Sequence, residues 1–91
     1  MKITWTEPAL IELEAIYDFL SPINPAAARR VVEDILLATD SLSLFPYRGR
    51  KGRLPHTREL VIVRPYLIIY RIVGDEVLIL RIWHSAQDHF A

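Results

Sequence analysis

The C-terminal half of the chain contains three strand-like segments that follow one another very closely. Residues 59–63, 66–73 and 77–83 are each rich in β-branched, aliphatic and aromatic side chains. The dipeptides Arg64-Pro65 and Gly74-Asp75 separate them, and both are typical of tight turns. Two tight turns in succession leave little choice of topology, so these segments predict an antiparallel meander of three strands.

The N-terminal half has the periodicity of helices. Thr6 is a suitable N-cap, and apolar residues then recur with the spacing of one helix face until Ser21-Pro22 ends the pattern. Asn24 caps a second helix that has Pro25 at its first position, and Pro46 ends it. The apolar stripes are Leu13, Ile16, Tyr17 and Leu20 in the first helix, and Ala28, Val31, Val32, Ile35, Leu42 and Phe45 in the second.

A short strand-like segment, Ile3–Trp5, precedes the helices and completes the order β-α-α-β-β-β. A chain of 91 residues with 52% hydrophobic residues is long enough to bury one core but not two. We therefore expect residues 1–91 to form a single α+β domain. In this domain a two-helix hairpin packs on one face of a small, mostly antiparallel sheet.

The composition excludes several classes of protein and site. Cysteine is absent, which excludes disulfides, a thiolate nucleophile and a cysteine zinc site. The longest apolar run, Tyr66–Tyr70, is far shorter than the roughly 20 residues that span a bilayer, and no signal peptide is visible. The glycines form no phosphate-binding loop, and the histidines lack metal-ligand spacing. We expect a cytoplasmic protein without membrane segment, metal or cofactor.

Basic residues are concentrated in the middle of the chain. Residues 48–71 hold seven basic residues against Glu59 alone, whereas residues 1–47 hold three against seven acidic ones. The chain as a whole is neutral, which argues against tight non-specific nucleic-acid binding, since such binding usually comes with a strongly basic domain. We also expect no specific DNA binding by the protein alone. The basic segment predicts either a local contact with an acidic partner or a solvated basic loop over residues 47–57.

The predicted strands are apolar on both faces, although the helices cover only one. A sheet face in water should be polar, and a large exposed apolar patch usually marks a partner surface. The alternatives are a wrong face assignment or a sheet curled enough to bury both sides. Alternation assigns Val61, Val63, Tyr66, Ile68, Tyr70, Ile72, Leu78, Leu80 and Ile82 to the helix side. It assigns Arg58, Leu60, Ile62, Arg64, Leu67, Ile69, Arg71, Ile79, Arg81 and Trp83 to the opposite side.

Three stretches resemble the RelE/ParE toxin superfamily, and most nearly its ParE branch. They are Thr57–Leu60 (TREL), Pro65–Ile72 (PYLIIYRI) and Val77–His84 (VLILRIWH), and the likeness extends to the opening strand and the helix hairpin. The resemblance implies the toxin half of a bacterial type II toxin–antitoxin pair, a class often associated with plasmid stabilisation. It also implies a cognate antitoxin whose flexible C-terminal segment wraps the toxin.

Within this superfamily the ParE branch poisons DNA gyrase and the RelE branch cleaves mRNA in the ribosome. The resemblance therefore implies inhibition of gyrase by binding, without catalytic residues. Arg71 and Arg81 could instead be ion-pair partners of Glu59 or Asp88. The residues expected to bind the antitoxin are Arg58, Leu60, Leu67, Ile69, Arg71, Arg81 and Trp83. Those expected to contact the target are Arg48, Arg50, Lys51, Arg53, His84, Gln87 and Phe90.

The alternative is a RelE-like, metal-free endoribonuclease, which needs charged and proton-transferring groups at the matching positions. Arg58 fits this pattern, but Leu60 and Leu67 cannot carry charge or a proton, and Phe90 stands about where a tail tyrosine is expected. The ParE pattern has a gap too, since Gln87 replaces a basic residue. A third interpretation is an inert partner subunit. For a ribonuclease, the catalytic residues would be Arg58, Arg81, His84 and His89.

Overall fold

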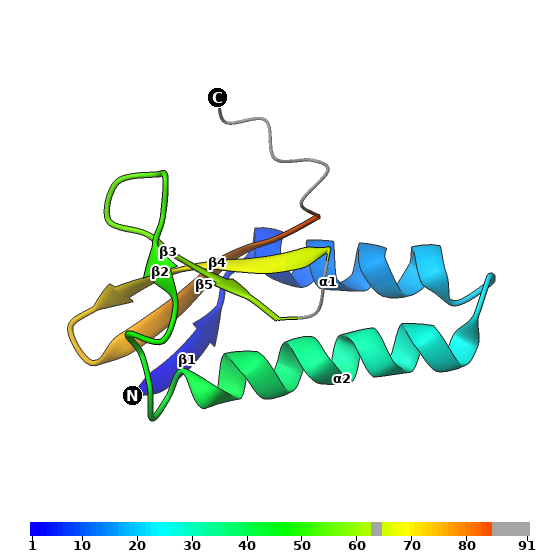
Figure 1. Cartoon of the computed structure of the whole chain (residues 1–91), viewed down its shortest axis with the longest axis horizontal. Helices are drawn as coiled ribbons and strands as arrows, with labels where there is room; N and C mark the ends of the chain where they lie inside the picture. The colour runs from blue at the N-terminus through cyan, green and yellow to red at the C-terminus, as the bar shows by residue number, and fades with distance from the viewer. Residues whose placement is uncertain (63–64, 85–91) are drawn as a thin grey trace.

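The computed structural model describes residues 1–62 and 65–84, and it confirms the predicted packing of two helices against one sheet (Figure 1). The sheet has five strands in the order β1-β5-β4-β3-β2. No helix in the described part of the chain is long and apolar enough to cross a membrane. The helices are α1 (Glu7–Leu20) and α2 (Pro25–Ser41), and the strands are β1 (Lys2–Trp5), β2 (Arg50–Lys51), β3 (Arg58–Val61), β4 (Tyr66–Val73) and β5 (Glu76–His84).

The strands β3, β4 and β5 form the predicted antiparallel meander. Gly74, in the turn between β4 and β5, has a φ of 60°, which is the left-handed conformation that glycine adopts most readily. Arg64, half of the other predicted turn, lies outside the described residues. The alternation of apolar residues and the turn chemistry therefore agree with the observed order of these three strands.

The strands β1 and β2 form the two edges of the sheet. β1 runs parallel to β5, from the pair Lys2 and Glu76 to the pair Trp5 and Ile79. At the other edge the two-residue strand β2, within the predicted loop, pairs with β3. Thr6 is the N-cap residue of α1 as predicted, but its hydroxyl donates to the carbonyl oxygen of Ile79 on β5 at 2.7 Å and makes no cap hydrogen bond to the helix.

The second helix begins as predicted and ends four residues before the predicted end. The Asn24 Oδ1 accepts a hydrogen bond from the Ala27 backbone N–H at 3.1 Å, which confirms the predicted cap. Near the other end, the hydroxyls of Thr39 and Ser41 donate to backbone carbonyls three residues earlier. Such local bonds compete with the regular helix, and the chain turns after Ser41. Phe45, predicted to lie on the buried stripe, is exposed.

A bulge in β5 decides which of its residues reach the core. Ile69 pairs with Arg81 while Tyr70 pairs with Ile79, so Leu80 is an extra residue on β5. An extra residue shifts the alternation by one position. Ile79 therefore lies in the core, and its predicted assignment to the opposite face was wrong.

The face assignment of β3 was also wrong. Leu60 pairs with Ile68 and is buried in the core, whereas Val61 pairs with Leu67 and is exposed. Both positions of β3 are apolar, so alternation alone does not distinguish them. Ile62 packs against the core as well. The buried cluster between helices and sheet consists of Ala9, Ile35, Ala38, Leu42, Leu60, Ile68, Tyr70, Val77, Ile79 and Ile82.

Candidate functional site

The sheet face opposite the helices carries a narrow buried apolar strip, not the broad exposed patch that was predicted. Leu67 and Ile69 are only 3% and 1% exposed, although neither belongs to the core cluster. The prediction of an exposed apolar face was wrong, and the interpretation in which both faces are buried fits better. The neighbours in register are Val61 and Trp83 beside Leu67, and Glu59 and Arg81 beside Ile69.

Glu59 is a buried carboxylate on this face that holds two residues of the basic loop. Its side chain is 3% exposed and lies 3.1 Å from Arg50 Nη2 and 3.4 Å from Arg53 Nε. The backbone N–H of Arg53 donates to the Oε2 of Glu59 at 3.1 Å. Burial raises the pKa of Glu59, but these hydrogen bonds and the Arg53 charge outweigh burial and lower the pKa overall. Two predicted target contacts, Arg50 and Arg53, are therefore already engaged within the molecule.

Arg81 forms a two-pronged ion pair with Glu12 on α1. Its Nε and Nη2 donate to the two Glu12 oxygens at 3.0 and 2.8 Å, and the Ile82 backbone N–H donates to Glu12 Oε1 at 3.0 Å. The hydrogen bonds that Arg81 donates to Glu12 raise the pKa of Arg81. The Arg81 guanidinium also lies 4.9 Å from the ring centroid of Trp83. An ion pair for Arg81 is thus confirmed, and its carboxylate is Glu12 and not Glu59. Asp88, the other predicted partner, lies outside the described residues.

Arg58 lies on the helix side of the sheet, since it pairs with Tyr70, so its predicted place on the opposite face was wrong. Its guanidinium is 4.8 Å from the ring centroid of Tyr47 and donates to the carbonyl oxygen of Gly49 at 2.8 Å. The buried Tyr70 hydroxyl contacts the same segment: it accepts from the Gly49 N–H at 2.9 Å and donates to the Pro46 carbonyl at 2.7 Å. A β-carbon on Gly49 would lie 2.7 Å from this hydroxyl, so only glycine fits.

The other predicted basic residues have few partners. The guanidinium of Arg48 donates to the Ser41 hydroxyl at 2.7 Å. Arg71 is exposed and shares the face of Leu67 and Ile69. Within residues 1–62 and 65–84, Arg48, Lys51 and Arg71 form no ion pair with a carboxylate.

Of the predicted tail residues, only His84 is described. Its ring meets that of Tyr66 edge-to-face, with 5.4 Å between the centroids. Gln87, Asp88, His89 and Phe90 lie outside the described residues. In the described part of the chain, no group of three acidic or histidine side chains is placed to hold a metal ion.

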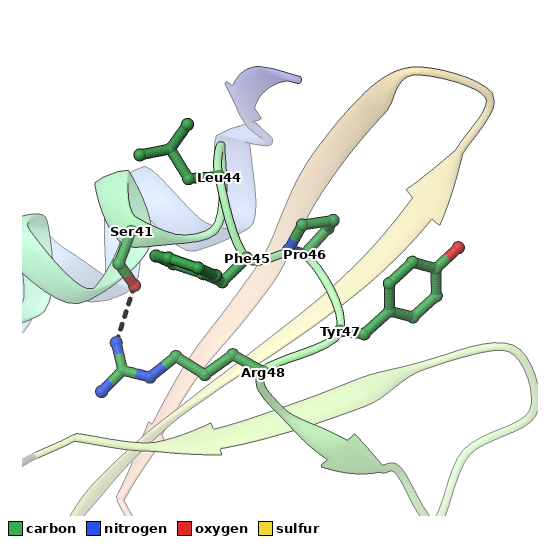
Figure 2. Close-up of a pocket in the computed structure, with 6 residues that line it drawn as sticks. All are labelled: Ser41, Leu44, Phe45, Pro46, Tyr47 and Arg48. Carbon is green, nitrogen blue, oxygen red and sulfur yellow. Dashed lines mark hydrogen bonds between the residues drawn. The ribbon is translucent and has the colours of Figure 1, made fainter.

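Two adjoining surface hollows were not predicted from the sequence. The first follows α2, measures about 690 Å³, and is lined by Ser41, Leu44, Phe45, Pro46, Tyr47 and Arg48 (Figure 2). The second measures about 670 Å³, shares Tyr47, and includes Lys51 and Arg58 in its lining. Leu42 and Phe45 masked the signal, because their spacing continues the apolar stripe of the second helix up to Pro46.

Comparison with known proteins places the chain in a family. Residues 3–89 match the family described as ParE toxin of type II toxin-antitoxin system, parDE. Toxin RelE2 of Caulobacter vibrioides is 41% identical over 86 residues, which are 94% of this chain and 97% of that protein. The putative toxin Y4kP of Sinorhizobium fredii is 45% identical over 88 residues, covering 96% and 91%.

A solved structure supports the same assignment. The chromosomal ParDE TA system from P. aeruginosa contains a chain that superimposes with a TM-score of 0.84 at 34% identity, covering 92% of this chain and 95% of that one. The YoeB/ParE toxin from Agrobacterium tumefaciens, with a TM-score of 0.66 and 20% identity, shares the fold. The chain therefore belongs to the ParE toxin family and is a type II toxin of the ParE/RelE superfamily.

Proposed function

We propose that this toxin inhibits DNA gyrase by binding it, and that a cognate antitoxin holds it inactive in the cytoplasm. The observation that carries the proposal is the burial of apolar residues at two positions where a RelE-like ribonuclease would need charged groups. Leu60 is buried in the core and Leu67 is buried on the opposite face, so neither position presents a cation to a phosphate. The similarity to a ParDE system adds support for the gyrase-directed branch.

Two charged clusters of the described residues, Glu59 with Arg50 and Arg53 and Glu12 with Arg81, also serve structure and not acid–base chemistry. Cleavage of RNA without a metal requires a base for the 2′-hydroxyl, an acid for the leaving oxygen, and free cations over the phosphate. The lowered pKa of Glu59 keeps it ionised between Arg50 and Arg53, so it is a poor proton donor. Arg81 is occupied by Glu12. These contacts favour an inhibitory binding protein.

We propose that the antitoxin segment lies along the sheet face opposite the helices. The buried residues Leu67 and Ile69 share this face with Arg71, Arg81 and Trp83. Arginine and tryptophan side chains often contribute most of the binding energy at protein interfaces. Leu60 is excluded from this surface because its side chain is in the core, and Arg58 because it lies on the helix side. The basic loop from Arg48 to Arg53, with His84, Gln87 and Phe90, is the proposed contact with gyrase.

Two assays on one preparation distinguish the branches. The proposal predicts that purified toxin blocks the supercoiling of relaxed plasmid by gyrase, that antitoxin restores it, and that ribosome-bound mRNA stays intact. Unaffected supercoiling together with cleaved mRNA would replace the proposal with the ribonuclease. If neither activity is found and expression in a susceptible host causes no growth arrest, the chain is an inert partner subunit. On a plasmid, an active pair of this kind would stabilise its carrier.

A charge reversal tests the antitoxin surface separately. Arg71→Glu should weaken antitoxin binding by about 10-fold, because an exposed cation becomes a repulsive anion at the contact. Arg29→Glu, an equally drastic change on the exposed side of α2, is the matched control and should leave affinity unchanged. Titration calorimetry measures both. Equal affinities for Arg71→Glu and the control would show that the antitoxin lies elsewhere.

A further inference from the structure

The segment that follows α2 turns its apolar side chains outward. Leu44, Phe45 and Tyr47 are 78%, 64% and 66% exposed, and they surround the hollow of about 690 Å³. Figure 2 shows Leu44 and Tyr47 projecting away from the backbone, while Arg48 reaches back to Ser41 beneath Phe45. Exposed apolar clusters on a small protein usually mark an interaction surface.

This surface is fixed in place by the core. The hydroxyl of the fully buried Tyr70 donates a hydrogen bond to the Pro46 carbonyl and accepts one from the Gly49 N–H. The core therefore fixes the backbone on both sides of Tyr47 and Arg48. The Arg58 guanidinium binds the Gly49 carbonyl from the sheet. Because these bonds use the inner side of the segment, its side chains point to solvent. A preformed surface of this kind needs little ordering when a partner binds.

The apolar hollow opens beside a cationic one. Tyr47 lines both, and the Arg58 guanidinium stacks on its ring. Lys51 and Arg58 line the second hollow and Arg48 the first, and none of the described residues that line either hollow is acidic. None of these three cations pairs with a carboxylate within residues 1–62 and 65–84. The adjoining hollows are thus apolar at one end, cationic at the other, and electrostatically unbalanced.

We propose that these two adjoining hollows, called here the Tyr47 surface, bind an acidic amphipathic segment of a partner protein. Apolar side chains of the segment enter the hollow between Leu44, Phe45 and Tyr47, and carboxylates face Lys51 and Arg58. A protein segment fits better than a nucleic acid, because aliphatic Leu44 and Pro46 offer nothing to a phosphate or a base, and the chain is neutral overall.

The inference concerns the chemistry of the bound segment and does not depend on gyrase inhibition. It adds Leu44, Phe45 and Tyr47 to the basic residues of the loop and specifies what they recognise together. If gyrase is unaffected by the toxin, peptide binding at the Tyr47 surface is still expected. If the peptide fails to bind, the gyrase proposal is untouched.

The test is fluorescence anisotropy of the full-length toxin with a short fluorescein-labelled peptide. The peptide has Leu and Phe at positions i, i+3, i+4 and i+7 and Glu and Asp at the remaining positions, so that a helix has one apolar and one acidic face. Two control peptides replace either the acids by Gln and Asn or the apolar residues by Ser. A thymidine oligonucleotide of similar length is the nucleic-acid competitor. Saturable binding of the acidic amphipathic peptide alone, weakened by salt, is the expected result.

Matched variants locate the binding. Phe45→Ser and Lys51→Glu should each weaken binding by about 10-fold, as removal of a central contact typically does. Ile23→Ser and Arg29→Glu make the same changes at exposed positions near the other end of the helices, and they should leave the affinity within about twofold. All four positions are exposed, and circular dichroism melts confirm that the variants fold.

Three results would overturn the inference. One is the absence of peptide binding, or equal binding by wild type and by Phe45→Ser. Another is binding of the uncharged peptide or the oligonucleotide as strong as that of the acidic peptide. The third is sedimentation showing a toxin dimer that Phe45→Ser converts to monomer, because the surface would then bind a second copy of this chain.

Discussion

Replacing Tyr70 by phenylalanine removes one hydroxyl and leaves the shape of the core unchanged. That hydroxyl donates to the Pro46 carbonyl at 2.7 Å and accepts from the Gly49 N–H at 2.9 Å, and the residue is fully buried. Both backbone groups would lose their partner. A buried polar group without a partner costs about 1–3 kcal/mol. Two such groups would cost about 2–6 kcal/mol, but Pro46 is only partly buried and water can reach it, so we expect a total loss at the low end, about 2 kcal/mol.

The assay is urea unfolding of Tyr70→Phe against wild type, followed by far-ultraviolet circular dichroism. In a thermal melt of a domain of this size, a loss of about 2 kcal/mol corresponds to a Tm that is lower by about 10 °C. Tyr17→Phe is the control, since Tyr17 is partly exposed on α1 and its hydroxyl makes no hydrogen bond within the described residues, so its loss should stay under about 0.5 kcal/mol. Equal stability of Tyr70→Phe and wild type would refute the anchoring of residues 46–49.

Three further changes test other contacts. Glu59→Gln should lower the free energy of unfolding by about 2 kcal/mol at pH 7, since it leaves two arginines without their buried carboxylate. The Glu59 pKa is lower in the folded protein, so its stabilisation is present at neutral pH and lost as pH falls through the folded pKa; urea unfolding at several pH values should show wild type approaching the variant in acid. Gly49→Ala should destabilise more than Gly74→Ala in thermal melts, because its new β-carbon meets the Tyr70 hydroxyl at 2.7 Å. A β-carbon on Gly74 would meet no other atom, so Gly74→Ala should lose only about 1 kcal/mol, because alanine disfavours the left-handed φ. Equal losses in the two variants would contradict both the close contact at Gly49 and the open space at Gly74.

The elements that follow from local chemistry were predictable from the sequence. Asn24-Pro25 specifies a helix start through one cap and one restricted φ, and β4 keeps the predicted bounds Tyr66–Val73 because a turn precedes it and Gly74 follows it. Both signals lie within a few residues of the feature that they determine. The resemblance to ParE toxins was confirmed as well.

The features that depend on contacts between distant residues were not predictable. The bulge at Leu80 is invisible in an unbroken apolar run, and it moves Ile79 from one face of the sheet to the other. The parallel partner of β1 lies more than seventy residues away along the chain. Glu12, the partner of Arg81, is one of several acidic residues in the first helix, and nothing local in the sequence singles it out. For the same reason the exposed face was misplaced, and the apolar surface after α2 was missed.

The central claim is that the toxin acts by binding and not by turnover, and the stoichiometry of inhibition tests it most directly. A fixed amount of gyrase is titrated with toxin, and the supercoiling rate is followed. The account predicts that inhibition needs at least one toxin per inhibited enzyme and reverses when antitoxin is added. Gyrase that stays fully active under excess toxin, while a trace of the same toxin degrades many equivalents of ribosome-bound mRNA, would contradict the account.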